Sequence, residues 1–147
     1  MLPIKTILHP TDFSDLSDAA FRTACALAGD HGSRLVVLHV VPPPQSHGEV
    51  IARRQGEGYH EDLRRLLERV RPEDAALSVE RRLEDGDPAE TILRVAREEA
   101  ADLIVLGTHG RGALGKMLLG SVAEQVVRRA PCPVLTTNAT PRRGVGS

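Results

Sequence analysis

Hydrophobic residues along the chain fall into two patterns: compact apolar runs, and longer stretches in which apolar positions recur at helical spacing. The first pattern predicts five strands, at residues 4–9, 34–41, 77–83, 103–106 and 134–137. Continuous apolar runs such as residues 34–41 indicate strands that are buried on both faces. In the third segment, Leu77, Val79 and Leu83 alternate with polar residues, which predicts a strand with one wet face at a sheet edge.

The second pattern predicts a helix after each of the first four strands. These helices cover about residues 15–30, 49–70, 87–100 and 121–130. Two of them carry a capping box at their start, formed by Asp87 with Glu90 and by Ser121 with Glu124.

The alternation of strands and helices predicts the fold class. It indicates an α/β protein with a single parallel, doubly wound sheet and right-handed crossovers. We find neither an internal repeat nor a linker that would split the chain, so residues 1–137 are expected to form one domain. Residues 138–147 are polar and contain proline and glycine, and we expect them to form a flexible tail.

Composition narrows the classes of partner. The 147 residues suffice for one domain with a proper core, and the net charge of -1 provides no general attraction for nucleic acid or anionic membranes. No apolar run approaches the length of a membrane span, and there is no secretory signal pattern. We therefore expect a cytoplasmic protein without nucleic-acid or membrane partners.

Cysteine and aromatic residues are scarce. Cys25 and Cys132 are too few for a disulfide framework or a zinc site, and we expect both to be structural. The aromatic residues are Phe13, Phe21 and Tyr59 alone. A bound base is therefore expected to be held by aliphatic side chains and backbone, and Tyr59 is expected in the apolar stripe of the second helix.

The stretch after the fourth strand has the features of a phosphate site. Gly107 ends the apolar run and Gly110, Gly112, Gly115 and Gly120 follow before the last helix begins. Glycine allows backbone N–H groups to approach an anion closely. The start of a helix adds unpaired N–H donors and the positive end of its dipole.

Three motifs compete within this stretch. Gly110-x-Gly112-x-x-Gly115 matches a dinucleotide fingerprint, but the helix does not open at Gly115 and the acidic ribose partner is missing. Gly110-x4-Gly115-Lys116 is one residue short of a Walker A loop, because the next residue, Met117, provides no hydroxyl for magnesium. The remaining spacing is Gly107-x2-Gly110-x9-Gly120-Ser121.

Ligands of open α/β sheets bind at the carboxyl ends of strands, where the strand order reverses. If strands one and four are neighbours there, Asp12 offers a carboxylate to ribose, to the base amine or to magnesium, and the Val40 backbone can contact a base edge. The glycines and Ser121 would hold phosphates, with positive charge from His109, Arg111 and Lys116.

Structural roles remain open for several of these residues. Asp12 could only cap the first helix, alone or alongside Ser14, and Ser121 is expected to cap the last helix. His9 and His39 lie near strand ends, but we find no third spaced ligand and expect no metal site.

From Pro3 to Thr137 the chain resembles the universal stress protein family, ATP-binding type. The resemblance rests on residues 10–14 (PTDFS), 38–40 (LHV), the glycine spacing above, and 131–135 (PCPVL). It implies a five-stranded sheet of order 3-2-1-4-5 with helices on both faces. It also implies ATP as the cofactor, with or without Mg²⁺, and homodimers paired through Val134–Thr137.

By the same resemblance, a defined set of residues would contact the nucleotide. These are Pro10, Thr11, Asp12, Val40, Leu106, Gly107, His109, Gly110, Gly120, Ser121 and Val122. His9 departs from the aliphatic residue or tyrosine common at its position in the family.

The first functional hypothesis is an ATP-binding stress-response or signalling protein that acts as a nucleotide-dependent switch. Its hydrolysis would be slow or absent, since no Walker A hydroxyl and no general base can be named, and we assign no catalytic residue. The alternative is a dimeric scaffold of the same fold that binds no nucleotide. A third hypothesis, an adenylyl or phosphoryl transferase, would need an additional substrate domain or lid, for which 147 residues leave little room.

Overall fold

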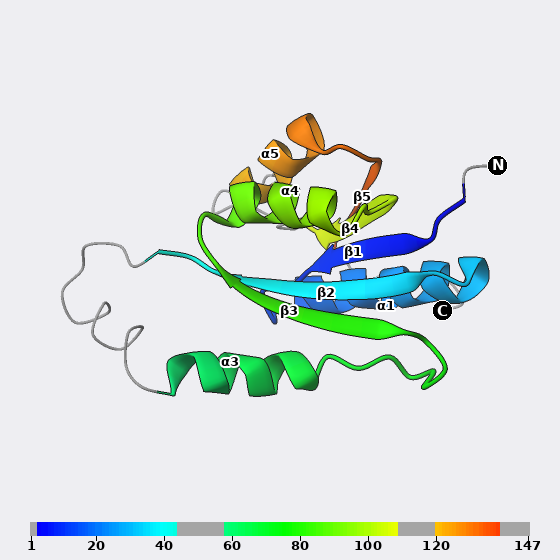
Figure 1. Cartoon of the computed structure of the whole chain (residues 1–147), viewed down its shortest axis with the longest axis horizontal. Coiled ribbons are helices and arrows are strands. Elements are labelled where there is room, and N and C mark those ends of the chain that lie inside the picture. Colours follow the sequence, from blue (N-terminus) through cyan, green and yellow to red (C-terminus); the bar gives the residue numbers. More distant parts are fainter. Residues whose placement is uncertain (1–2, 44–57, 109–119, 139–147) are drawn as a thin grey trace, which may run out of the picture.

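The computed structural model describes residues 3–43, 58–108 and 120–138, which form a parallel five-stranded sheet of order β3-β2-β1-β4-β5 (Figure 1). The strands are β1 (Thr6–Pro10), β2 (Arg34–Val41), β3 (Val79–Asp85), β4 (Leu103–Gly107) and β5 (Val134–Thr137). The predicted fold class and strand order are confirmed. The tail beyond residue 138 lies outside the described residues and stays a prediction.

Helices cover both faces of the sheet (Figure 1). Helices α1 (Asp15–His31) and α3 (Tyr59–Glu68) lie on one face, and α4 (Pro88–Glu98) and α5 (Ser121–Arg129) lie on the other. None of the helices in the described residues is long and apolar enough to cross a membrane.

The central strands explain the continuous apolar runs of the sequence. In β2, Leu35 and Val37 face α1, whereas Val36 and Leu38 face α4, and all four side chains are fully buried. Strand β3 lies at the edge and exposes Glu80 to solvent, as the alternating pattern predicted. Hydrophobic burial on both faces of β1 and β2 thus forms the two layers of the core.

Helix α1 packs closely on the sheet because its inner face is small. Ala20, Ala24 and Ala28 are fully buried. A Cβ atom placed on Gly107 of β4 would lie 2.8 Å from the backbone oxygen of Leu16. Glycine at position 107 is therefore required for the contact between the first turn of α1 and the end of β4.

Two helix starts differ from expectation. Of the helix predicted over residues 49–70, the described part begins at Tyr59, preceded by Gly58 with φ +92, while residues 44–57 lie outside the described residues. The predicted cap of α5 by Ser121 was wrong. Gly120 is the N-cap, its carbonyl oxygen accepts from the Glu124 N–H at 2.9 Å, and Ser121 already occupies the first helical position.

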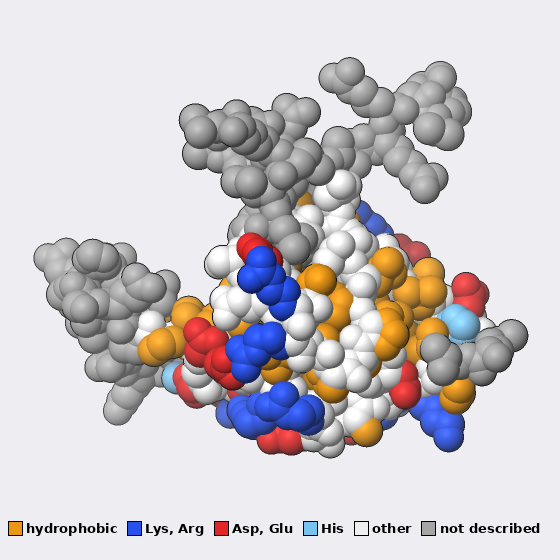
Figure 2. Space-filling model, turned by 90° about the horizontal axis from the view of Figure 1, so that it is seen from above, with side chains coloured by type: hydrophobic (Ala, Val, Ile, Leu, Met, Phe, Trp, Pro, Cys, Tyr) orange, Lys and Arg blue, Asp and Glu red, His pale blue; other side chains and the backbone are white. Residues whose placement is uncertain are grey.

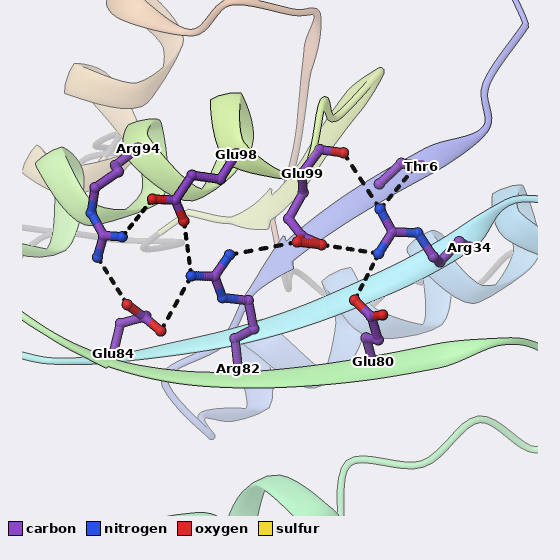
Figure 3. Close-up of polar contacts among 8 residues, drawn as sticks. All are labelled: Thr6, Arg34, Glu80, Arg82, Glu84, Arg94, Glu98 and Glu99. Atoms are coloured by element: carbon purple, nitrogen blue, oxygen red, sulfur yellow. Dashed lines mark hydrogen bonds and ion pairs between the residues drawn. The ribbon is translucent and has the colours of Figure 1, made fainter.

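Ion pairs join α4 to the edge of the sheet (Figure 3). The participating residues are Arg34, Glu80, Arg82, Glu84, Arg94, Glu98 and Glu99. Arg82 is central, since its guanidinium lies 2.9 Å from Glu98, 3.3 Å from Glu84 and 3.5 Å from Glu99. In a space-filling view from the α4 and α5 side, basic and acidic side chains gather in adjacent groups (Figure 2). The network joins the C-terminal half of α4 to β2 and β3, while the first residues of α4 line the candidate site.

Candidate functional site

A cleft of about 410 Å³ opens where the carboxyl ends of β1, β2 and β4 meet. Strands β1 and β4 are neighbours, so this is the point at which the chain order reverses across the sheet. All the predicted nucleotide contacts in the described part of the chain line this cleft: Pro10, Thr11, Asp12, Val40, Leu106, Gly107, Gly120, Ser121 and Val122. His109 and Gly110, with Arg111 and Lys116, lie outside the described residues.

One wall of the cleft is apolar. Leu38 and Val40 of β2, Leu106 of β4 and Ile92 of α4 contribute buried aliphatic side chains. Val40 is paired in register with Glu84 of β3, at the carboxyl end of both strands. This wall suits the flat face of an aromatic ring, which gains by leaving water.

The cleft is also lined by the carboxylate of Asp12. Its Oδ1 accepts hydrogen bonds from the backbone N–H of Ser14 at 3.0 Å, from the Ser14 hydroxyl and from the Ser17 hydroxyl at 2.6 Å. Burial works to raise the pKa of Asp12, but the bonds from Ser14 and Ser17 outweigh it and hold the pKa below its usual value. The group is therefore a fixed negative charge, with all these bonds on a single oxygen.

Asp12 does not cap α1 itself. Ser14 is the N-cap, and its hydroxyl accepts from the Ser17 N–H at 3.2 Å. Asp12 instead orients both serines, so its structural and ligand-binding roles are compatible. Neither Ser14 nor Ser17 was predicted as part of the site, although both line the cleft.

The turn that presents Asp12 is held in a strained conformation. Phe13 has φ +66, which side-chain-bearing residues rarely adopt, and its ring packs on His39 with centroids 4.4 Å apart. The Thr11 N–H donates to the Leu38 carbonyl at 2.8 Å, and the Phe13 N–H donates to the Thr11 hydroxyl at 3.1 Å. These hydrogen bonds stabilise the strained turn and so hold Asp12 in place.

The start of α5 also lines the cleft. Helices α1 and α4 are capped by the Ser14 and Asp87 side chains, with Asp87 accepting from the Glu90 N–H at 2.9 Å. Among the described residues no side chain caps α5 at Gly120. The first N–H groups of α5, at Ser121 and Val122, therefore lie at the cleft without intrahelical acceptors, which is the arrangement that attracts anions.

An aromatic residue does line the cleft, contrary to expectation. Tyr59 was expected in the apolar stripe of a longer helix, but it is the first residue of α3 and lines the cleft, as does Pro42. Pro88 and Ile92 at the start of α4 were also missed as site residues. A helical pattern identifies the buried face of a helix, but it does not tell which end reaches a cleft.

The two strand-end histidines differ: His9 lies in the core, whereas His39 lines the cleft. His9 is fully buried, and its Nδ1–H donates to the Val105 carbonyl at 2.9 Å. Burial lowers the pKa of His9 to about 4, so the ring is neutral. His39 Nδ1–H donates to the Thr11 carbonyl at 2.7 Å. Within residues 3–43, 58–108 and 120–138, no three His, Cys, Asp or Glu side chains come together as a metal site.

A larger hollow of about 780 Å³ lies between α1 and α3. Its wall is apolar at Phe21 and Leu77, with charged residues such as Arg22 and Arg69 around it. We assign the candidate site to the smaller cleft because the switch point, the fixed carboxylate and the uncapped helix all meet there.

These features define a class of protein: a doubly wound α/β domain with a ligand cleft at the carboxyl edge of its sheet. The sequence profile of the Universal stress protein family matches residues 3–138. The chain belongs to the universal stress protein family.

Individual relatives agree in sequence and fold. A universal stress protein of Thermus aquaticus is 46% identical over 139 residues, which cover 89% of this chain and 96% of that protein. The structure of UspA from Lactobacillus plantarum has a TM-score of 0.74 at 29% identity, covering 92% of this chain and 99% of that one. A universal stress protein in complex with cAMP gives a TM-score of 0.68 at 26% identity, covering 95% and 100%.

Proposed function

We propose that this protein binds ATP in the cleft between β1 and β4 and acts as a nucleotide-dependent switch in stress response or signalling. The observation that carries the proposal is the uncapped start of α5 in a cleft that also holds the fixed carboxylate of Asp12. A relative solved with cAMP supports a nucleotide as the ligand class.

The chemistry of the cleft fits each part of a nucleotide. The base would lie on the aliphatic wall at Val40 and Leu106, and the ribose hydroxyls would donate to Asp12. The phosphates would accept from the N–H groups of Ser121 and Val122 and from the Ser121 hydroxyl. Mg²⁺, where present, would enter with the phosphates.

Slow hydrolysis or none follows from the groups in the cleft. Among the described residues that line the cleft, Asp12 is the one acidic side chain, and hydrogen bonds hold the pKa of Asp12 below its usual value. Such a weakly basic group is a poor general base for activating water near neutral pH. A bound nucleotide would therefore persist as a signal.

A homodimer through β5 is the second part of the proposal. Strand β5 is at the sheet edge, and Leu135 on it is 38% exposed, as is Val127 of the neighbouring α5 at 47%. An unpaired apolar edge strand favours pairing with a second copy. Sedimentation velocity of the wild type and of Leu135→Lys tests this, and equal sedimentation of the two proteins contradicts it.

The decisive experiment measures nucleotide content and affinity. Purified protein is denatured, the supernatant is separated by anion exchange, and the stripped protein is titrated calorimetrically with ATP, ADP, AMP and cAMP, each with and without magnesium. Co-purified ATP or micromolar ATP binding supports the proposal. Absence of both would favour the alternative, a dimeric scaffold whose cleft binds no nucleotide.

A further inference from the structure

Tyr59 reaches the cleft from the opposite layer of the molecule. Helix α3 lies on the other face of the sheet from α4 and α5 (Figure 1). Its first residue, Tyr59, nevertheless lines the cleft. The lining of the cleft also includes the apolar residues Pro42, which follows β2, and Pro88 and Ile92 of α4. Asp12 and the start of α5 belong instead to the β1 and β4 side of the sheet.

The position of Tyr59 is fixed by its neighbours. Gly58 has φ +92, a conformation that favours glycine, and its carbonyl accepts the first helical bond from the Asp62 N–H at 2.9 Å. His60 Nε2 lies 2.8 Å from Asp85 Oδ1 at the end of β3. The Tyr59 ring meets the His60 ring nearly edge-on, with centroids 5.9 Å apart. The first turn of α3 is thus attached to the edge of the sheet.

Tyr59 is the one Phe, Trp or Tyr residue that lines this cleft, and the cleft is also lined by His39, whose ring packs on Phe13. The chain has three Phe, Trp or Tyr residues in all, and Phe21 packs on His9 while Phe13 packs on His39, on the α1 side of the sheet. Tyr59 alone of the three lines the cleft, and its side chain is half-buried there. An aromatic ring stacks on any base through the π-faces of both groups.

We propose that Tyr59 packs on the base of the bound nucleotide, and so makes the cleft select nucleotides over ribose phosphates and polyphosphate. The inference rests on the proposed nucleotide-binding function and adds a specificity residue to it. The phenol ring provides contact to the base alone, whereas Asp12 and α5 contact the ribose and the phosphates.

Tyrosine fluorescence can test this contact. It contains one tyrosine and no tryptophan, so its intrinsic emission comes from Tyr59. ATP titration is expected to quench this emission, with half-saturation at the Kd that calorimetry gives. Free N-acetyltyrosinamide corrects for absorption by adenine. Ribose 5-phosphate and tripolyphosphate are expected to leave the emission unchanged.

Substitutions at Tyr59 distinguish the effect of losing the aromatic ring from an effect on folding. Tyr59→Ala is expected to weaken ATP binding about tenfold, or about 1.4 kcal/mol. Tyr59→Phe keeps the ring and should bind within about twofold of wild type, since a stacking contact needs no hydroxyl. The matched control is Arg64→Ala, an exposed residue of the same helix outside the cleft, which should bind ATP normally. If Tyr59→Ala does not fold, Tyr59→Leu preserves most of the volume and carries the same comparison.

The two proposals fail differently. If wild type binds ATP but the removal of the Tyr59 ring changes neither affinity nor selectivity, and emission is not quenched, the stacking inference is overturned and the nucleotide cleft stands. If wild type binds no nucleotide by calorimetry, both proposals are wrong.

Discussion

Replacing Ser121 by proline tests the anion site at a single backbone N–H. Ser121 is the first residue of α5, the helical position at which proline is favoured because no intrahelical bond is lost. Gly120 has φ -59 and ψ 151, an extended conformation that a residue before proline readily adopts. Ser121→Pro should therefore keep the helix while removing the N–H and the hydroxyl.

The expected magnitude follows from the charge of the ligand. A hydrogen bond to an ionised oxygen contributes about 1.5–3 kcal/mol, so its loss should raise the Kd for ATP by about 10- to 150-fold. Ser121→Ala removes only the hydroxyl and should have a smaller effect. The stability of the proline variant should match or exceed wild type by up to about 1 kcal/mol, since proline restricts the unfolded chain.

Calorimetry with ATP and with adenosine distinguishes the phosphate contact from a general effect. Adenosine has no phosphate, so its affinity should be the same in wild type, Ser121→Ala and Ser121→Pro. Equal ATP affinity of the alanine and proline variants would refute the role of α5 as an anion site. A parallel loss of adenosine and ATP binding would show that the substitution distorts the cleft, and the reasoning about position 121 would be wrong.

The remaining predictions concern stability. Gly107→Ala should lower the free energy of unfolding in urea by about 1–3 kcal/mol, because a Cβ there meets backbone at 2.8 Å, whereas Gly29→Ala, with its nearest new contact at 4.0 Å, should raise it by about 0.5–1 kcal/mol. Burial lowers the pKa of His9 from 6.5 to about 4, so the unfolded state binds more protons between these values. The free energy of unfolding should fall by about 2 kcal/mol as pH drops from about 7 to 5, and a constant value would contradict this. In His9→Leu, the part of the pH dependence that His9 causes should be absent. Arg82→Met should lower the melting temperature at low salt, and the loss should shrink near about 1 M NaCl, where ion pairs are screened; an equal loss in both salts would exclude the ion-pair explanation.

The sheet could be predicted from sequence because its central strands are buried on both faces. The four consecutive buried residues Leu35 to Leu38 of β2 belong to a short apolar run between two helical patterns, and this length and context favour a strand. The strand order came from the family resemblance, as did site residues such as Pro10 and Thr11. Asp12, Val40 and the glycines were also expected from the position of the strand ends at the switch point. Gly107 could be identified as a strand terminator, but its contact with Leu16 could not be read from the pattern.

The details that sequence missed depend on one-residue shifts and on tertiary position. Ser121 has the side chain of a capping residue, yet the helix begins one position earlier because the Gly120 carbonyl accepts the first bond. Tyr59 sits at the right spacing for a core stripe, and only the position of α3 relative to β2 brings it to the cleft. The Ser14 and Ser17 bonds to Asp12 likewise require the folded turn.

The helices differ in their N-caps, and this difference links a ligand in the cleft to the stability of the sheet edge. Helices α1 and α4 complete their first turns with side chains of the chain itself, while α5 does not within the described residues. A phosphate group bound there would act as the missing cap, contributing to the folding of α5 as Ser14 does for α1. Helix α5 leads directly into β5, the edge strand. A ligand bound in the cleft would therefore also stabilise β5, the edge strand through which a second copy is proposed to pair.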